Sequence, residues 1–268
     1  MDLGLENKVV VVTGAAGGVG AAVARAFCAE NSRVVFVDRD PGGAGALEGY
    51  GDRAWFMPCD VSDLDRVTAL FEEVDRRLGC VHVLVNNAAV STAGWVEDIR
   101  EQDLQRVIDV NIRGYVHTTM RALPLMRKAG FGRLIYINSS SGLKASAGLS
   151  LYSASKYFDR GFAVAVALEA GRHNITANSI CPSDIYPEGD DPRTRAGSWT
   201  NQSLVRVSLE KEEVSSLPEL MAKRRRRNPM RRSCTVQDVA DLALFLASER
   251  AGFINGQSIG LNGGVVPY

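Results

Sequence analysis

Tyr152 and Lys156 stand four residues apart near the start of a predicted helix over 151–171. Residues at this spacing share one face of a helix. A phenol has an unperturbed pKa of about 10, and a nearby ammonium lowers it because the positive charge stabilises the phenolate. The pair is therefore suited to moving a proton to or from an alcohol oxygen. Since a tyrosine and a lysine at this spacing often occur by chance, a packed tyrosine beside a solvated lysine is the alternative interpretation.

Ser139 follows a predicted strand over 133–138 and precedes Tyr152 along the chain. Its hydroxyl can hydrogen-bond the same substrate oxygen that Tyr152 would protonate or deprotonate. Ser139 also begins a run of three serines and a glycine, so a turn or helix-capping role is the alternative. The three side chains together predict general acid–base chemistry at an alcohol or carbonyl group.

A glycine-rich turn, Thr13 to Gly20 (TGAAGGVG), lies between a predicted strand over 8–13 and a predicted helix over 19–30. Glycine tolerates positive φ and lets backbone N–H groups approach a ligand, and a helix N-terminus adds unpaired donors and partial positive charge. We therefore predict that a pyrophosphate binds here, at Gly14, Gly18, Val19 and Gly20. A tight strand-to-helix connection without a ligand is the alternative.

Asp38 ends the second predicted strand, where a ribose-binding acid is expected downstream of such a turn. A carboxylate at this point can accept both hydroxyls of an adenosine ribose, and its charge would repel a 2′-phosphate. Ala15 and Ala16 supply no cation for that phosphate. The neighbouring Arg39 is the one residue that favours NADP instead. An exposed turn acid is the alternative for Asp38. The residues favour NAD over NADP.

Short β-branched runs alternate with helical patterns along the chain, which indicates βαβ units. We predict one α/β domain over residues 1–268, a Rossmann-type doubly wound parallel sheet of about seven strands with helices on both faces. Ligands bind such sheets beyond the carboxyl ends of the strands, where nearly all the candidate residues fall. The predicted strands span 8–13, 33–37, 54–57, 81–85, 133–138, 175–180 and 257–261, and the predicted helices span 19–30, 63–78, 101–128, 151–171 and 236–247.

Residues 183–230 show no clear strand or helix rhythm, so we predict a long substrate loop there, which includes Trp199. Its far end carries a basic run that includes four consecutive arginines, Arg224 to Arg227. A solvated helix face or a subunit contact is the favoured interpretation of this run. A clamp for an anionic substrate is the alternative.

Composition excludes several classes of function. The formal net charge is zero, so no general attraction to nucleic acid or to an anionic membrane is expected. The N-terminal residues lack the features of a signal peptide, and no apolar run is long enough to span a bilayer, which makes a cytoplasmic protein the expectation. Five scattered cysteines without CxxC spacing argue against disulfides and a zinc site, and His82 is interpreted as a structural histidine, so no metal is predicted.

In combination, these motifs resemble the short-chain dehydrogenase/reductase family over essentially the whole chain. Three departures from the family pattern affect turn geometry near the cofactor: Ala89 and Ser183 stand in place of glycines, and His82 in place of an acid. The matching residues, in chain order, are Thr13 to Gly20, Asp60-Val61, Asn86-Asn87-Ala88, Asn111, Ser139, Tyr152, Lys156, Gly256-Gln257 and Gly263-Gly264.

The resemblance implies a role for each matching residue. Tyr152 would donate or accept the proton, Lys156 would bind the nicotinamide ribose and tune Tyr152, and Ser139 would position the substrate oxygen. Asn111 would hold a water in a proton relay. The remaining predicted cofactor-binding residues are Asp60, Val61, Asn87, Ala88, Pro182 and Ile185.

The sequence thus predicts an oxidoreductase that transfers a hydride between NAD(H) and a secondary alcohol or ketone. A looser similarity to the polyol and sorbitol-6-phosphate dehydrogenase branch places polyols, sugars and acidic sugar derivatives first among small-molecule substrates. A homo-oligomer, with a tetramer favoured, is implied by the family alone. The alternatives are a non-catalytic NAD(H)-binding sensor or scaffold, and a nucleotide-sugar epimerase or dehydratase that uses bound NAD without net turnover.

Overall fold

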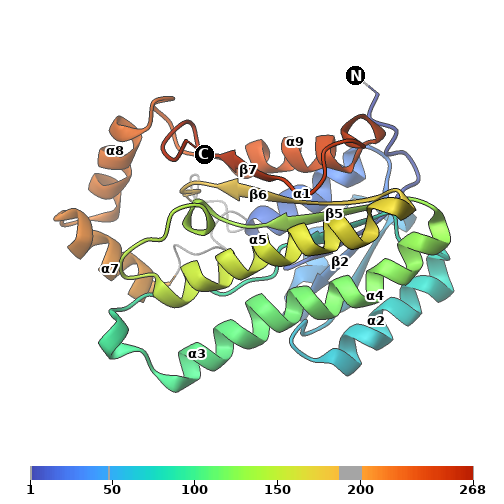
Figure 1. Cartoon of the computed structure of the whole chain (residues 1–268), viewed down its shortest axis with the longest axis horizontal. Coiled ribbons are helices and arrows are strands. Elements are labelled where there is room, and N and C mark those ends of the chain that lie inside the picture. The colour runs from blue at the N-terminus through green and yellow to red at the C-terminus, as the bar shows by residue number, and fades with distance from the viewer. Residues whose placement is uncertain (1, 48, 187–200, 268) are drawn as a thin grey trace.

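A computed structural model describes residues 2–47, 49–186 and 201–267. Its centre is a parallel sheet with the strand order β3-β2-β1-β4-β5-β6-β7 (Figure 1), so the chain moves outward from β1 in one direction and then in the other. This is the predicted doubly wound arrangement. The seven strands are β1 (Val9–Thr13), β2 (Arg33–Asp38), β3 (Ala54–Pro58), β4 (Val83–Asn86), β5 (Gly132–Ile137), β6 (Ile175–Pro182) and β7 (Ser258–Leu261).

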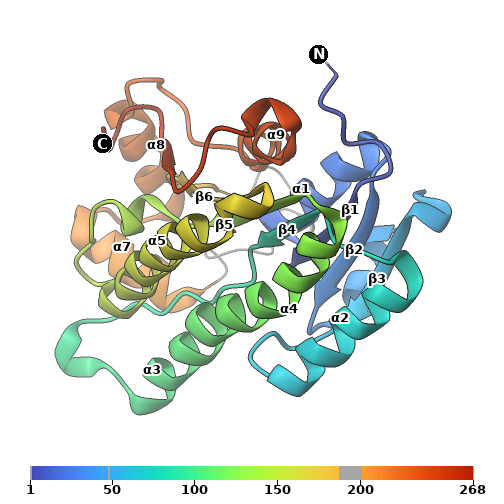
Figure 2. The same ribbon diagram turned by 45° about the vertical axis from the view of Figure 1, so that its right-hand side comes forward.

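Helices cover both faces of the sheet, with α1 and α9 on one side and α2, α4 and α5 on the other (Figure 2). The larger helices are α1 (Gly18–Ala29), α2 (Leu64–Leu78), α3 (Glu101–Val107), the π-helix η4 (Ile108–Arg113), α4 (Gly114–Ala129), α5 (Ser150–Ala170), α7 (Gln202–Glu212), α8 (Leu217–Arg227) and α9 (Val236–Ala247). The short 3₁₀ helices are η1 (Pro41–Leu47), η2 (Gly51–Arg53), η3 (Val96–Asp98), η5 (Ser140–Gly142), η6 (Gly171–His173) and η8 (Glu249–Ala251). In the described part of the chain, no helix is long and apolar enough to cross a membrane.

The two hydrophobic cores follow from the alternation of side chains along each strand. In β1, Val10 and Val12 pack toward α1 and α9, while Val9 and Val11 pack toward α2 and α4. Every residue of β1 is buried. A central parallel strand that is covered on both faces needs apolar side chains at consecutive positions, which explains the continuous valine run.

The segment 183–230 differs from its prediction, because it contains the helices α7 and α8 rather than a loop alone. Asn201 caps α7 by accepting hydrogen bonds from the N–H groups of Ser203 and Leu204, and Ser216 caps α8. Both helices stand at one end of the molecule, beyond the sheet (Figure 1). They bury few side chains there, so the apolar rhythm is weak. Residues 187–200, with Trp199, lie outside the described residues.

The predicted helix over 101–128 is likewise divided, because the π-helix η4 separates α3 from α4. A π-turn shifts the following side chains around the helix axis and is frequent at functional sites. Asn111 lies in this turn and is fully buried.

Gly20 allows the turn between β1 and α1 to close on itself. A Cβ at Gly20 would lie 2.1 Å from the carbonyl oxygen of Gly14, and neither backbone can yield without moving the turn. Gly14 and Gly18 themselves have positive φ values of 66° and 54°.

We expect Gly20→Ala to lower the free energy of unfolding by about 2 kcal/mol or more, because the added methyl group overpacks a backbone contact. Urea unfolding followed by circular dichroism measures this change. Gly45→Ala is the control, since a Cβ at Gly45 meets no atom within 4 Å and should change stability by no more than about 0.5 kcal/mol. Equal effects of the two substitutions would contradict this account of the turn.

Candidate active site

A cleft of about 940 Å³ lies along the carboxyl ends of the strands. It extends from the turn after β1, across the ends of β2 and β4, to Tyr152 on α5 and the helices α7 and α8. Gly20 and Asn111 do not line it, because Gly20 packs beneath the turn and Asn111 is buried behind the wall. The predicted residues that line the cleft are Gly14, Gly18, Val19, Asp38, Asp60, Val61, Asn87, Ala88, Ser139, Tyr152, Lys156, Pro182 and Ile185.

The glycine-rich turn between β1 and α1 is braced by Asn87, which follows β4. The Asn87 side-chain amide donates to the carbonyl oxygens of Thr13 (2.9 Å) and Gly14 (3.1 Å), and the Thr13 hydroxyl accepts from the backbone N–H groups of Asn87 and Ala88. Gly17 is the N-cap of α1 and makes no side-chain cap hydrogen bond. No side chain therefore caps the first N–H groups of α1, and a Cβ at Gly14 would meet Asn87 at 2.8 Å. Both features fit a bound pyrophosphate at this turn.

Two carboxylates, Asp38 and Asp60, line the end of the cleft next to the glycine-rich turn. Asp38 accepts hydrogen bonds from the N–H groups of Ala16 (3.0 Å) and Asp40 (3.1 Å), which fix its carboxylate beside the turn. Burial raises the pKa of Asp60, but hydrogen bonds from Ser62 and the charge of Arg39 outweigh that effect, so its pKa is lowered. Both acids are therefore positioned to accept hydrogen bonds from a ligand.

Tyr152 lies in the first turn of α5, and Ser139 lies between β5 and η5, so both face the cleft at the point where these elements meet. The Ser139 hydroxyl accepts the N–H of Ser141 at 3.1 Å, which makes it the cap of η5, as its alternative interpretation proposed. The hydroxyl proton remains available as a donor. Capping and substrate binding are thus compatible at Ser139.

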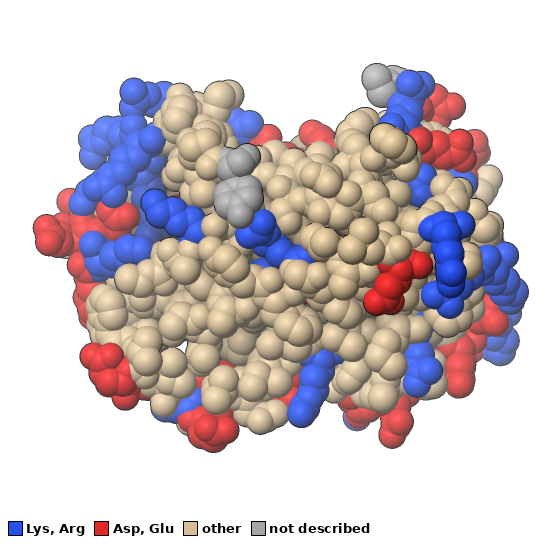
Figure 3. Space-filling view, in the orientation of Figure 1, with Lys and Arg blue, Asp and Glu red and all other residues tan. Residues whose placement is uncertain are grey.

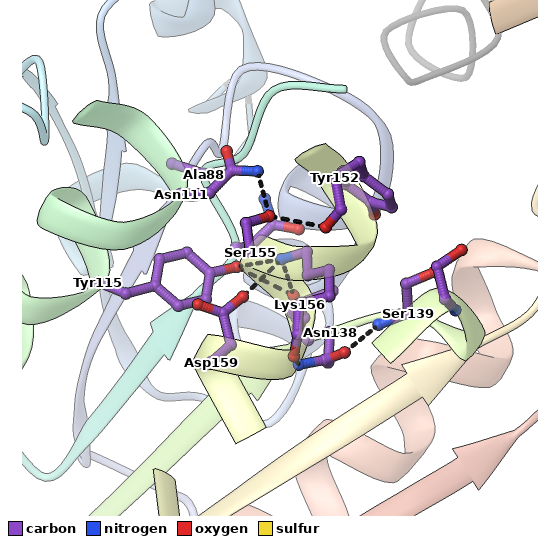
Figure 4. Close-up of polar contacts among 12 residues, drawn as sticks. Ala88, Asn111, Tyr115, Asn138, Ser139, Tyr152, Ser155, Lys156 and Asp159 are labelled. Carbon is purple, nitrogen blue, oxygen red and sulfur yellow. Dashed lines mark hydrogen bonds and ion pairs between the residues drawn. The ribbon is translucent and has the colours of Figure 1, made fainter. Parts of the chain in front are cut away.

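Lys156 is buried, with only 1% of its side chain exposed, so the alternative of a solvated lysine is wrong. Its ammonium donates to the carbonyl oxygen of Ile137 (3.0 Å), the hydroxyl of Tyr115 (3.2 Å) and a carboxylate oxygen of Asp159 (3.0 Å). Figure 4 shows this side chain directed toward Tyr115 and Asp159. The ammonium nitrogen is 5.9 Å from the centre of the Tyr152 ring, close enough to act on it electrostatically.

Asn111 connects the π-helix to the turn of α5 that carries Tyr152. Its amide exchanges hydrogen bonds with the backbone of Val90, accepting the N–H at 2.8 Å and donating to the carbonyl at 3.0 Å. It also donates to the hydroxyl of Ser155, which donates in turn to the carbonyl oxygen of Tyr152 (Figure 4). The structure therefore gives Asn111 a bracing position; the relay water implied for it stays a prediction.

The sequence analysis missed four polar residues around this set: Tyr115, Asn138, Ser155 and Asp159. A signal for Asp159 was present, because it lies on the buried stripe of α5 otherwise made of small residues and Lys156. A carboxylate on such a stripe needs a partner, since burying an unpaired charge is costly. Ser155 shares that stripe, and Tyr115 lies four residues after Asn111, but neither spacing is distinctive.

The arginine run belongs to the last turns of α8. Arg224 lines the cleft and pairs with Asp184 (2.9 Å) and, less closely, with Glu212 (3.6 Å), while Arg227 pairs with Glu212 (2.6 Å). Arg225, Arg226 and Arg227 are exposed and do not line the cleft. These three arginines therefore form a solvated helix face, as the favoured interpretation predicts. The charge of Arg224 is balanced by two carboxylates.

The cysteines and histidines show no metal centre. Within the described ranges, no group of three His, Cys, Asp or Glu residues could hold a metal ion, and all five cysteines are free thiols. His82 accepts the N–H of Val9 at 2.9 Å, and burial lowers its pKa. His82 therefore has the structural position that was predicted for it.

Comparison with known proteins identifies the family. The sequence profile described as short chain dehydrogenase matches residues 8–195, and the one described as Enoyl-(Acyl carrier protein) reductase matches residues 202–266. A 3beta-hydroxysteroid dehydrogenase of Mediterraneibacter gnavus is 31% identical over 98% of this chain and 96% of its own, and a galactitol 2-dehydrogenase of Agrobacterium fabrum is 32% identical over 97% and 98%. The solved structure of an aldohexose dehydrogenase of Thermoplasma acidophilum in ligand-free form superposes with a TM-score of 0.81 at 27% identity, covering 99% of this chain and 96% of that one.

These matches span both ends of the cleft and agree with the arrangement of the strands. The chain belongs to the short-chain dehydrogenase/reductase family, as an oxidoreductase that uses a nicotinamide cofactor to interconvert an alcohol and a ketone.

Proposed function

We propose that this protein transfers a hydride between NAD(H) and a secondary alcohol or ketone, with Tyr152 as the proton donor and acceptor. The observation that carries the proposal is a single cleft that joins the phosphate-binding turn to Ser139, Tyr152 and Lys156. The nicotinamide ring, when bound, supplies or accepts the hydride. Gly14, Gly18, Val19, Asp38, Asp60, Val61, Asn87, Ala88, Pro182 and Ile185 would hold the cofactor.

In the proposed reaction, the Tyr152 phenolate removes the hydroxyl proton of the alcohol during oxidation, and the phenol returns a proton to the ketone oxygen during reduction. Lys156 favours the phenolate through its positive charge. Ser139 donates a hydrogen bond from its hydroxyl to the substrate oxygen and fixes that oxygen beside Tyr152. Asn111 acts indirectly, because its hydrogen bond to Ser155 braces the turn that carries Tyr152.

Asp38 is the basis for proposing NAD rather than NADP. Its carboxylate is fixed by two backbone N–H groups at the edge of the cleft, so it cannot turn away from a 2′-phosphate without breaking both hydrogen bonds. Arg39 also lines the cleft, but its charge acts on the pKa of the neighbouring Asp60. Like-charge repulsion from Asp38 would therefore dominate.

For the substrate, we propose a hydroxyl-rich secondary alcohol, such as a polyol, a sugar or an acidic sugar derivative. The far end of the cleft combines apolar side chains, among them Leu149, Leu204 and Val207, with a similar number of hydrogen-bonding groups, and these groups can bind the hydroxyls of such a molecule. Galactitol and aldohexoses appear among the names of similar proteins. The polar groups at this end are Lys144, Ser146, Asp184, Asn201, Lys211, Glu212 and Arg224.

We further propose a homo-oligomer, with a tetramer favoured by the family, in the cytoplasm. Figure 3 shows the face that carries α4 and α5 as a broad uncharged area with the charged groups mostly around its rim. Exposed apolar side chains on these helices include Met120, Phe158, Val164 and Leu168, and Leu168 is 82% exposed. Apolar areas of this kind mark subunit contacts. The five free thiols are in keeping with a reducing compartment.

Tyr152→Phe should lower kcat/KM for alcohol oxidation by about 100-fold or more, because the ring stays in place but its transferable proton is lost. Formation of reduced cofactor is followed with a panel of polyols, sugars, sugar acids, hydroxysteroids and short hydroxy acids. Tyr157→Phe, on the outer side of the same helix, is the matched control; it removes only the hydrogen bond from that hydroxyl to the carbonyl oxygen of Leu143 (3.0 Å), so it should retain activity close to that of the unchanged protein. Full turnover by Tyr152→Phe would refute the assignment, and a preference for hydroxysteroids would refute the substrate class.

With the best substrate, kcat/KM for NAD⁺ should exceed that for NADP⁺ by about 100-fold or more. Asp38→Asn should narrow this ratio at least about tenfold, because the amide keeps the shape of the carboxylate but not its charge. Asp40→Asn removes a neighbouring exposed charge and should have a smaller effect. Preference of the unchanged enzyme for NADP⁺ would overturn the proposed cofactor, while the proton chemistry at Tyr152 would be unaffected.

Light scattering on the purified protein should give the mass of an oligomer, that is, a whole number of chains greater than one. Leu168→Glu places a charge within the apolar face and should shift the mass toward smaller species, because an unpaired charge is costly to bury. Val96→Glu, at an exposed apolar residue on η3, is the control and should leave the mass unchanged. A monomeric unchanged protein would contradict this part of the proposal.

A further inference from the structure

Asp159 and Lys156 form an ion pair inside the protein, beneath Tyr152. Asp159 is 0% exposed and Lys156 is 1% exposed, and the carboxylate oxygen Oδ2 accepts a hydrogen bond from the ammonium at 3.0 Å. The other oxygen, Oδ1, is buried and has no hydrogen-bond partner among the residues that the structure describes. A buried carboxylate that is only half satisfied is costly for stability, so its presence calls for an explanation.

The ammonium of Lys156 has no unused proton in this arrangement. It carries three N–H donors, and they are directed at three acceptors: Asp159, the hydroxyl of Tyr115 and the carbonyl oxygen of Ile137. Tyr115 also donates its own proton to Ile137, at 2.9 Å, which holds the three acceptors as one group. In Figure 4 dashed lines run from the lysine nitrogen to Tyr115 and to Asp159, below Tyr152. Any hydrogen bond from Lys156 to a ligand in the cleft must therefore replace one of these three.

We propose that Asp159 is a positioning residue that competes with the cofactor for Lys156. In the free enzyme, Asp159 holds the ammonium in the core. When the cofactor binds, Lys156 gives up its hydrogen bond to Asp159 in order to donate to the nicotinamide ribose. This inference rests on the proposed role of Lys156 as a ribose ligand, and it adds a residue that weakens cofactor binding.

The competition has a consequence for protons. Burial raises the pKa of Asp159 to about 6 even though the attraction of Lys156 pulls it down. When Lys156 turns toward the ribose, this pull weakens and the pKa of Asp159 rises further. Cofactor binding above about pH 6 therefore takes up a proton, and affinity falls as the pH rises above that value.

The other groups that face Asp159 stay uncharged across this range. These are Tyr115 on α4, Tyr136 on β5 and Cys181 on β6. Burial raises the pKa of Tyr115 and of Tyr136, and it raises the pKa of Cys181 to about 11. Burial by itself lowers the pKa of Lys156, but the charge of Asp159 and its hydrogen bond with the ammonium act in the opposite direction, and the pKa of Lys156 is raised overall, so the ammonium stays protonated. The pair thus has one titrating member.

The test is the binding of NADH, or of NADPH if that binds more tightly, measured by fluorescence titration between pH 6 and pH 8.5. The dissociation constant of the unchanged protein should rise with pH, by up to about tenfold per unit. Asp159→Asn keeps the shape but cannot take up the proton, so it should bind about tenfold more tightly at pH 8 and lose the pH dependence. Asp75→Asn, which breaks the exposed Lys128–Asp75 ion pair (2.7 Å), is the matched control and should follow the unchanged protein.

Two further measurements distinguish a failure of the role proposed for Lys156 from a failure of the role proposed for Asp159. Calorimetric titration of the unchanged protein in two buffers of different ionisation enthalpy counts the protons taken up, and this test needs no variant that might misfold. Lys156→Met should weaken binding at every pH. Unaltered binding by Lys156→Met would refute the proposed role of Lys156 itself. Weakened binding by Lys156→Met, together with no proton uptake or with an unchanged pH dependence in Asp159→Asn, would overturn the role of Asp159 alone.

Discussion

The polar junction between the end of β5 and the inner face of α5 fixes the positions of Ser139, Tyr152 and Lys156 relative to one another. The side-chain amide of Asn138 donates to the carbonyl oxygen of Lys156 at 2.9 Å, and its oxygen accepts the N–H of Ser139 at 2.8 Å. One side chain therefore sets the distance between the serine and the helix that carries Tyr152. A Cβ at Gly142 would lie 2.1 Å from the Asn138 oxygen, which explains the glycine at the end of η5. Loosening this junction would separate groups that act on one substrate oxygen, and small displacements of that kind are costly for catalysis.

The same junction determines what the interior must contain. Because Lys156 stands on the buried side of α5, its charge has to be matched by acceptors from neighbouring elements, and β5, α4 and α5 each supply one. Replacing such an ion pair by apolar side chains would often stabilise a protein, whereas removing one partner is destabilising by about 3–5 kcal/mol. The proposed competition between Asp159 and the cofactor for Lys156 would account for a charge pair that is kept at a cost in stability. Its place beneath Tyr152 is consistent with an interior that favours control of the lysine over maximum stability.

The sequence predicted those parts of the molecule in which one local cause dominates. The doubly wound parallel sheet needed only the alternation of β-branched runs with helices, and the tight turn between β1 and α1 needed only glycines at a strand–helix junction. Two features escaped prediction because their causes lie in tertiary packing. Helices α7 and α8 have little apolar periodicity, since they lie over a cleft rather than on a core. The direction of the Lys156 ammonium depends on Tyr115 and Asp159, which come from two helices and meet only in the fold.

The two ends of the cleft are also held by different kinds of interaction, and this difference bears on how substrate choice can change. At the end next to the glycine-rich turn, backbone N–H groups and the half-buried side-chain amide of Asn87 fix the positions, so few side chains could be exchanged there without disturbing the turn. At the far end, Arg224, Asp184 and Glu212 are linked by ion pairs between side chains of α8, the segment after β6, and α7. Ion pairs of this type are partly exposed and tolerate rearrangement more readily than the hydrogen bonds to the backbone at the other end. Substitutions that change the substrate preference should therefore concentrate in α7, α8 and the segment after β6. The hydrogen bonds of Asn138 between β5 and α5, and those of Lys156 to its three acceptors, would meanwhile hold Ser139 and Tyr152 in place.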